Sequence, residues 1–139
     1  MQEEVLFPRP LINQLLHLAQ VSPDTEICGL IGARHGTPAS CYPVNNIAER
    51  PALRFLMDPA QQIDAMRNIR ENHEDLFAIY HSHPTAPAEP SATDLEQASY
   101  PDALQIIISL NTQGVLEMRG FRYRPRGHIE EIVVGIRNG

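Results

Sequence analysis

The sequence predicts an α/β fold built on a mixed β-sheet. Three observations indicate it: several short apolar runs of strand length, two longer segments whose apolar residues recur at helical spacing, and turn-forming residues between them. The chain has 139 residues, of which 42% are hydrophobic and 20% are charged. This balance is that of an ordinary globular protein, and the length is that of about one domain. We therefore expect residues 1–139 to form a single domain.

Three helices are expected, each with a recognisable beginning. In 9–20, three leucines and an isoleucine recur at helical spacing after two prolines. The segment 59–72 begins after Asp58, a good N-cap residue that is followed by proline in the first turn. Ser91 is a suitable N-cap for a third helix of about two turns.

Strands are expected where apolar or alternating runs are bounded by turn signals. The run at 76–80 is expected to be a central strand, because it is short and apolar, and it leads directly into His81. The expected strands lie at 27–32, 39–45, 55–57, 76–80, 106–108, 115–123 and 129–136.

Charge and composition exclude several classes of protein. Eleven Lys and Arg against seventeen Asp and Glu give a formal net charge of −6, the wrong sign for a nucleic-acid binder. No apolar run approaches the ~20 residues that cross a bilayer, and the acidic start lacks the basic region of a secretion signal. The two cysteines, Cys28 and Cys41, imply no disulfide framework. We expect a cytoplasmic protein that binds neither nucleic acid nor membrane.

The polar residues after the central strand suggest a metal site. His81 and His83 lie two apart on a strand, so they point to the same face with Cα atoms about 7 Å apart and can converge on one ion. The proline-rich stretch 84–90 brings Ser91 and Asp94 back toward the strand end, and these two face the same point of a helical turn. Two histidines and one carboxylate leave an open position on a tetrahedral zinc, as in catalytic sites.

Each part of this pattern also has an ordinary explanation. A His-x-His pair alone is common at a solvated strand end, and Ser91-x-x-Asp94 is also a helix capping box. Glu26 alone is explained as a surface carboxylate beside a turn. One helix start can serve both as a cap and as part of a site, so those explanations do not compete. The joint occurrence of all the parts favours the metal site.

The same stretches together resemble the motif of a known family. The residues at 26–30 (Glu-Ile-Cys-Gly-Leu), at 81–84 (His-Ser-His-Pro) and at 91–94 (Ser-Ala-Thr-Asp) resemble the full JAMM motif of the MPN (JAB) metalloprotease superfamily. The resemblance extends over nearly all of the chain and is greatest to the short prokaryotic members. It implies a curved, partly closed mixed sheet flanked by helices.

The resemblance also implies a role for each motif residue. His81, His83 and Asp94 would bind one zinc ion per chain, and Glu26 would be the general acid/base that activates the zinc-bound water. Ser91 would hold the oxygen of the tetrahedral intermediate or orient the water. Zinc lowers the pKa of its bound water to about 7, and a nearby carboxylate takes the proton and passes it to the leaving amine. The expected reaction is hydrolysis of a peptide or isopeptide bond without a covalent enzyme intermediate.

Size and resemblance together suggest the substrate. The short bacterial relatives in this superfamily act on small ubiquitin-like (β-grasp) sulfur-carrier proteins, at the bond beyond a C-terminal Gly-Gly, and we expect such a carrier to be the partner. The alternatives are a non-catalytic MPN-type binding or scaffold module, and a deubiquitinase-like or other peptidase with a different substrate. Iron instead of zinc is a further alternative at two histidines and one carboxylate, but the nearby Glu26 favours zinc. No residue pattern indicates an oligomeric state.

Other residues carry weaker signals. The four arginines within 119–126 could meet an acidic carrier surface, although a solvated edge strand explains them better. Asn45, Asn46 and Arg54 could border a substrate groove, and turn chemistry explains the asparagines equally well. We expect both cysteines to be small buried core residues and the four histidines outside the motif to be solvated. The cysteines are Cys28 and Cys41, the histidines are His17, His35, His73 and His128, and the arginines are Arg119, Arg122, Arg124 and Arg126.

Overall fold

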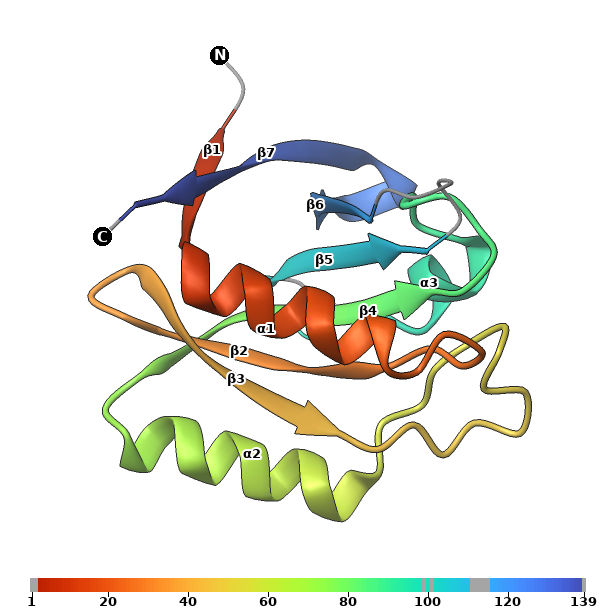
Figure 1. The fold of residues 1–139 in the computed structure, drawn as a ribbon, viewed down its shortest axis with the longest axis horizontal. Helices are drawn as coiled ribbons and strands as arrows, with labels where there is room; N and C mark the ends of the chain where they lie inside the picture. Colours follow the sequence, from red (N-terminus) through yellow and green to blue (C-terminus); the bar gives the residue numbers. More distant parts are fainter. Residues whose placement is uncertain (1–2, 99, 101, 111–115, 139) are drawn as a thin grey trace.

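The structure, a computed structural model, describes residues 3–98, 100, 102–110 and 116–138. Within these residues seven strands and three α-helices follow one another as Figure 1 shows. The strands are β1 (Glu4–Pro8), β2 (Cys28–Arg34), β3 (Thr37–Val44), β4 (Asp75–His83), β5 (Leu104–Ser109), β6 (Glu117–Tyr123) and β7 (Ile129–Arg137). The helices are α1 (Arg9–Gln20), α2 (Pro59–Glu71) and α3 (Ala92–Glu96), with a 3-10 turn at Pro125–Gly127.

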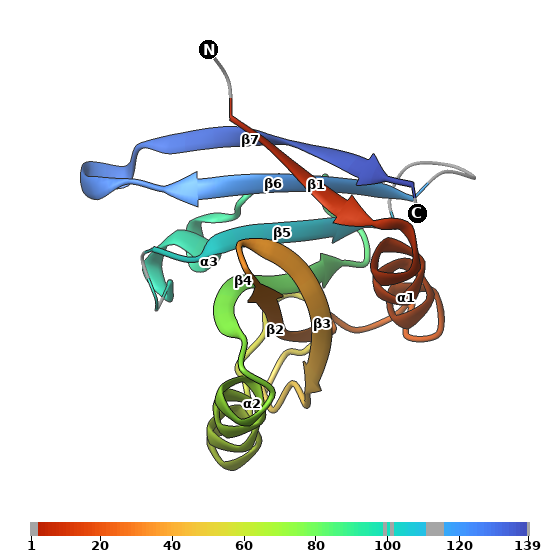
Figure 2. The same cartoon turned by 90° about the vertical axis from the view of Figure 1, so that its left-hand side faces the viewer.

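The strands form one mixed sheet in the order β1-β7-β6-β5-β4-β2-β3. β1 pairs with β7, and β4 with β5, in parallel, whereas the other neighbours are antiparallel. The sheet curls: Figure 2 shows it turning from β7 at the top down to β3, and the two edge strands β1 and β3 contact each other. The expected curved, partly closed mixed sheet is confirmed.

Two helices pack on opposite faces of this sheet. α1 contacts β1, β3 and β7 inside the curl, and α2 contacts β2, β3 and β4 from outside. The alternation along β4 shows the two faces, because Tyr80 lies in the core under α1 whereas Ile79 lies in the core under α2. Side chains two apart on a strand share a face, so His81 and His83 lie on the outer face with Ile79. The strand therefore delivers both histidines to one side of the sheet.

The core under α1 depends on a close approach between two neighbouring strands. The ring of Tyr80 is fully buried and lies against Gly29 on β2, where a Cβ atom would overlap the ring and come 2.6 Å from the carbonyl oxygen of Tyr42. The Tyr80 hydroxyl accepts a hydrogen bond from Cys41 Sγ at 3.3 Å. Glycine is required at position 29 because no side chain fits between these groups.

Most predicted elements are confirmed, with ends that differ by up to three residues. The helix at 9–20 is confirmed at both ends, and the helix at 59–72 ends one residue earlier than expected. The strand expected at 55–57 is wrong, since an isolated bridge between Asn46 and Met57 is the pairing observed there. The helix after the proline-rich stretch is shorter than two full turns, because α3 has five residues.

One strand was not predicted. β1 holds a brief alternation of Val5 and Phe7, and it pairs in parallel with β7 from the other end of the chain. So short a run carries little local signal, and its partner is distant in sequence. Val115, where a predicted strand begins, lies outside the described residues.

The arginine cluster lies on β6 and the turn that follows it. β6 lies between β5 and β7, so the expectation of an edge strand is wrong. Three of the four arginines form ion pairs within the chain, and Arg126 lies exposed in the 3-10 turn. The pairs join Arg119 to Glu131 (2.6 Å) and Glu89 (3.4 Å), Arg122 to Glu3 (2.9 Å) and Arg124 to Glu130 (3.1 Å).

The expected environments of the remaining cysteines and histidines are confirmed with one exception. Cys28 is buried, whereas Cys41 is half-buried, and both are free thiols. The four histidines outside the motif are exposed: His17, His35, His73 and His128.

In the described part of the chain, no helix is both long and apolar enough to cross a membrane.

Candidate metal centre

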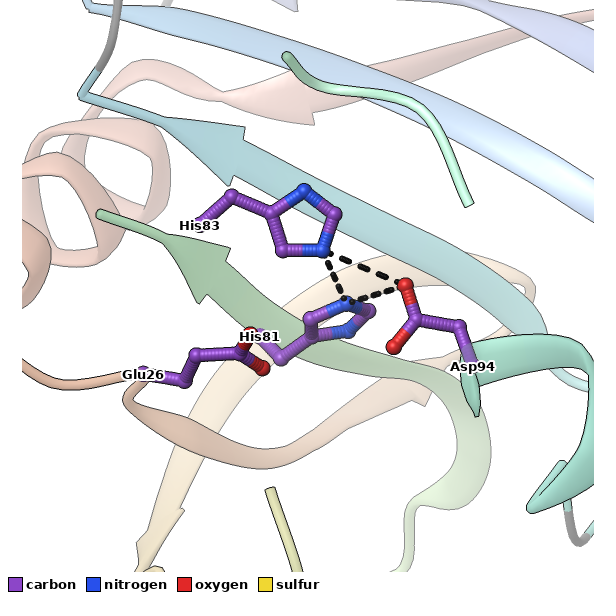
Figure 3. A group of neighbouring side chains, drawn as sticks. All are labelled: Glu26, His81, His83 and Asp94. Atoms are coloured by element: carbon purple, nitrogen blue, oxygen red, sulfur yellow. Dashed lines mark hydrogen bonds and ion pairs between the residues drawn. The ribbon is translucent and has the colours of Figure 1, made fainter. Parts of the chain in front are cut away.

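Four buried side chains from three parts of the chain converge on one point (Figure 3). Glu26 comes from the segment before β2, His81 and His83 from the end of β4, and Asp94 from α3. One atom of each that can bind a metal lies within 4.8 Å of the others. The structure thus brings together four of the five residues that the sequence singles out, and the fifth, Ser91, is the N-cap of α3.

Three of the converging atoms form a nearly equilateral triangle. His81 Nε2 lies 3.2 Å from His83 Nε2 and 3.1 Å from Asp94 Oδ2, and the third side, from His83 Nε2 to Asp94 Oδ2, is 3.2 Å. Ligands bound to a tetrahedral ion at about 2.0–2.1 Å lie about 3.3 Å from one another. Two imidazole nitrogens and one carboxylate oxygen therefore have both the chemistry and the spacing of a metal site.

The capping box of α3 holds Asp94 in place. Ser91 Oγ accepts a hydrogen bond from the Asp94 N–H at 3.0 Å, and Asp94 Oδ2 accepts one from the Ser91 N–H at 2.9 Å. The oxygen fixed by the cap is also the one that faces the histidines. Burial opposes ionisation of Asp94, but its close contacts with the His81 and His83 rings and the hydrogen bond from the Ser91 N–H outweigh burial and hold the pKa of the carboxyl well below its usual value. Asp94 thus offers a metal ion an anionic oxygen that is already in place.

The two histidines differ in their surroundings. His83 Nδ1 donates a hydrogen bond to the Pro87 carbonyl oxygen at 2.7 Å. The ring of His81 stacks on Phe55, with centroids 4.5 Å apart, and its Nδ1 is buried without a hydrogen-bond partner in the described chain. Burial lowers the pKa of His81, which favours the neutral ring that a metal requires.

Glu26 is a buried carboxyl group with one unpaired oxygen. It is 4% exposed, and its Oε1 has no hydrogen-bond partner among the described residues. The pKa of Glu26 is raised to about 8, chiefly by burial; the nearby His83 opposes the shift and Asp94 adds to it. A cation at the centre of the cluster would favour the ionised carboxylate, so this unpaired oxygen also fits a metal site.

A cavity of about 240 Å³ borders the cluster. Its wall includes the cluster members His81 and Asp94, the Phe55 ring and the side chains of Gln105 and Tyr123. The Tyr123 hydroxyl is buried and has no hydrogen-bond partner in the residues that the structure covers. Atoms of a bound molecule therefore have room beside the cluster.

The sequence does not give the contacts of three residues around the cluster. Phe55 is expected in a strand, but it lies in a loop and stacks on His81. For Asn46 a groove border and turn chemistry are both expected; its side chain accepts from the Ala48 N–H, as in a turn, and also donates to the carbonyl oxygen of Glu26. Tyr123 is expected in an alternating strand, and no local pattern distinguishes it from other strand residues.

Comparisons with known proteins agree with this geometry. A family model described as prokaryotic homologs of the JAB domain matches residues 8–122. The chain is 34% identical over 89 residues to a desampylase of Haloferax volcanii, a match that covers 63% of this chain and 64% of that protein, just under two thirds of its length. It is 31% identical over 125 residues to a CysO-cysteine peptidase of Mycobacterium tuberculosis, covering 88% of this chain and 85% of that protein.

A solved structure resembles the whole chain. The solution structure of a Desulfitobacterium hafniense protein matches with a TM-score of 0.86 and 29% identity, covering 97% of this chain and 94% of that one. The family match covers all four clustered residues, from Glu26 to Asp94. With most of its length matched and the cluster assembled, this chain belongs to the family of prokaryotic homologues of the JAB domain.

Proposed function

We propose that this chain is a zinc-dependent peptidase or isopeptidase of the JAMM type, which hydrolyses the bond after the C-terminal Gly-Gly of a small ubiquitin-like sulfur-carrier protein. The observation that carries the proposal is the buried cluster, in which three ligand atoms lie 3.1–3.2 Å apart beside an unpaired glutamate oxygen. A relative that matches most of the chain is a CysO-cysteine peptidase, so a peptidase is the activity to expect of such a cluster.

His81, His83 and Asp94 would hold the ion. Two nitrogens and one oxygen at tetrahedral spacing favour zinc and leave a fourth position open. Zinc bound there would supply a Lewis acid that polarises the scissile carbonyl and lowers the pKa of a water to about 7. The chain's own contribution is to keep the three ligand atoms fixed through the cap of α3 and the loop after β4.

Glu26 would move the proton. Its Oε1 is free to accept a proton from the attacking water and to deliver it to the nitrogen of the leaving amine. Ser91 would hold the oxygen of the tetrahedral intermediate: its Oγ accepts from the Asp94 N–H, so the hydroxyl hydrogen remains free to donate.

The substrate class rests on the relatives and on the shape of the site. The similar proteins include a desampylase, a CysO-cysteine peptidase and a probable TtuB-protein conjugate cleaving protease, and the last of these names specifies a protein conjugate. A Gly-Gly tail is slim and extended, so it fits beside a cavity of about 240 Å³, and β3 offers a sheet edge to pair with it. We place this activity in the cytoplasm, because Cys28 and Cys41 are free thiols, as is usual in reducing compartments.

The test is cleavage of a defined substrate. The zinc-loaded protein is incubated with a β-grasp carrier extended past its Gly-Gly, and intact masses are read over time. Glu26→Gln runs beside it, with Glu71→Gln, an exposed residue at the end of α2, as the matched control. Loss of the extension with wild type and E71Q, but not with E26Q, is the expected result.

Two other outcomes would count against the proposal. If the wild type leaves the extension intact, the sulfur-carrier assignment fails and a binding-only role becomes the better explanation. If E26Q cleaves at the wild-type rate, Glu26 is not the general base.

A further inference from the structure

Hydrogen bonds to the backbone N–H and carbonyl groups of Glu26 and Ile27 hold the segment that carries Glu26. The Glu26 N–H donates to the Pro51 carbonyl oxygen at 2.7 Å, and the Glu26 carbonyl oxygen accepts from Asn46 Nδ2 at 3.0 Å. The next residue, Ile27, donates its N–H to Ser82 Oγ at 2.9 Å and accepts from the Ser82 N–H at 3.1 Å. Glu26 lies before β2, so these bonds take the place of regular sheet pairing.

Asn46 uses both ends of its side-chain amide in this arrangement. Its Nδ2 donates to the carbonyl oxygens of Glu26 and Arg54, each at 3.0 Å. Its Oδ1 accepts from the N–H groups of Ala48 and Leu56, each also at 3.0 Å. One side chain therefore ties the segment before β2 to both ends of the loop between β3 and α2.

The same loop reaches the metal cluster from a second direction. Phe55 lies between Arg54 and Leu56, whose backbone groups Asn46 binds, and its ring stacks on His81. Asn46 thus links the backbone of the proposed base to the ring that lies against one of the proposed ligands. Within the described residues, the hydrogen bonds of the Asn46 side chain reach backbone groups and none of the four clustered side chains.

We propose that Asn46 is a positioning residue for the hydrolysis, which rests on the function proposed above. It sets the distance between the Glu26 carboxylate and the metal ligands by clamping the Glu26 backbone and the Phe55 loop to each other. A misplacement of the base by about 1 Å can cost about 100-fold in rate, so one amide can control activity without touching substrate.

An isosteric variant isolates the clamp. In Asn46→Asp the oxygen that accepts from the Ala48 and Leu56 N–H groups is retained. The Nδ2 group that donates to the carbonyl oxygens of Glu26 and Arg54 is lost. A new negative charge is the side effect to control for. Asn45→Asp adds the same charge one residue away. The Asn45 side chain is exposed, and it is the backbone of this residue that bonds to Gln61 Oε1 and to the Asp58 N–H.

The first measurement separates turnover from binding. For zinc-loaded wild type, N46D and N45D we would determine zinc per chain, kcat and KM on the extended carrier. In N46D we expect kcat to fall at least about 10-fold, with KM and zinc content within about twofold of the wild-type values. N45D should match the wild type. A role in general stability would lower the melting temperature but leave kcat per zinc-bound chain unchanged.

The second measurement needs no substrate, so it remains decisive if the proposed function fails. Hydrogen exchange is followed by mass spectrometry in the zinc-loaded proteins. Peptides that cover 24–28 and 50–57 should exchange faster in N46D than in N45D, whereas those from 76–83 should not change. Asn46→Ser, an uncharged variant, should show the same pattern.

Four results would overturn the proposal. One is a kcat for N46D within about twofold of that for N45D. Another is zinc lost in proportion to activity, which would place the effect on the ligands. The third is loss of a cooperative thermal transition in both N46D and N46S, which would make Asn46 a structural residue. Unchanged hydrogen exchange of the peptide that covers 24–28 in N46D would likewise contradict the clamp, whatever the result of the carrier assay.

Discussion

His83 donates its Nδ1 hydrogen to the carbonyl oxygen of Pro87, 2.7 Å away. A carbonyl oxygen can only accept, so the hydrogen must be on Nδ1, and in the neutral ring Nε2 keeps its lone pair. That nitrogen is the one that faces His81 and Asp94. The loop after β4 therefore orients His83 Nε2 toward the proposed metal position, and Ser109 steadies the loop by donating to the Ala86 carbonyl oxygen at 2.8 Å.

Removing any one of the three proposed ligands should abolish zinc binding. His81→Ala, His83→Ala and Asp94→Ala each leave two donor atoms, too few for a tight tetrahedral site. Zinc per chain, measured by elemental analysis after dialysis, should fall from one to near zero. His73→Ala and Asp64→Ala remove exposed residues of the same types and should leave zinc unchanged. Zinc retained in a ligand variant would show that the assignment is wrong.

The metal-free protein should become more stable when Glu26 is replaced by glutamine. Burial raises the pKa of Glu26 to about 8, whereas in the unfolded chain it stays near 4.5. Between these values the folded state binds a proton that the unfolded state lacks, so the wild type loses stability as pH rises through this window. We expect E26Q to exceed the wild type by about 2 kcal/mol at pH 7 and by almost nothing at pH 4.

Urea unfolding with a chelator present would measure this difference across pH. The exposed variant E71Q, which changes the same residue type at the end of α2, should follow the wild type at each pH. A difference between E26Q and wild type that does not vary with pH would contradict a buried, protonated Glu26.

Replacing Ser91 by alanine should reduce both stability and rate, for different reasons. The variant loses the N-cap of α3, which costs about 1 kcal/mol, and the proposed contact to the reacting oxygen. Asp58→Ala removes the N-cap of α2, which accepts from the Ala60 and Gln61 N–H groups, and should cost about as much stability. Chemical unfolding and carrier cleavage are measured on both. If D58A slows cleavage as much as S91A does, Ser91 has no role beyond its cap.

Replacing Gly29 by alanine should strongly destabilise the fold. The new Cβ would overlap the Tyr80 ring and come 2.6 Å from the Tyr42 carbonyl oxygen, and neither the buried ring nor the paired strand has room to shift. We expect a loss of about 3 kcal/mol in the free energy of unfolding. Gly36→Ala, at a positive φ but in open space, should lose only about 1 kcal/mol. Equal losses in the free energy of unfolding for the two variants would show that the Tyr80 ring or the strand moves to make room for the new Cβ atom.

The sequence predicted what depends on neighbouring residues. The helix at 9–20 was found because its leucines form one apolar stripe, and α3 because Ser91 and Asp94 form a capping box. The spacing of His81 and His83 placed both on one face of a strand, whatever that strand packs against. The residue-level roles of the site, and the single-domain organisation, remain predictions.

Long-range contacts explain the errors. Residues 55–57 are apolar enough for a strand, but Asn46 Oδ1 binds the Leu56 N–H and the Ile47 N–H binds the Leu56 carbonyl oxygen, so the backbone that a ladder would need is already bonded. β1 was missed because its partner, β7, lies at the opposite end of the chain. For the same reason no local pattern showed that β6 is an interior strand.

The sequence by itself determined which chemical groups are present and how each is presented locally: two imidazoles on one strand face and a carboxylate at a helix cap. Only the tertiary structure decided that they meet, that Glu26 joins them, and that its carboxyl is buried with one oxygen unpaired among the described residues. The reason is physical. Periodicity and capping act over a few residues, whereas burial, pKa and the contacts of Asn46 arise when segments far apart in the chain exclude water together.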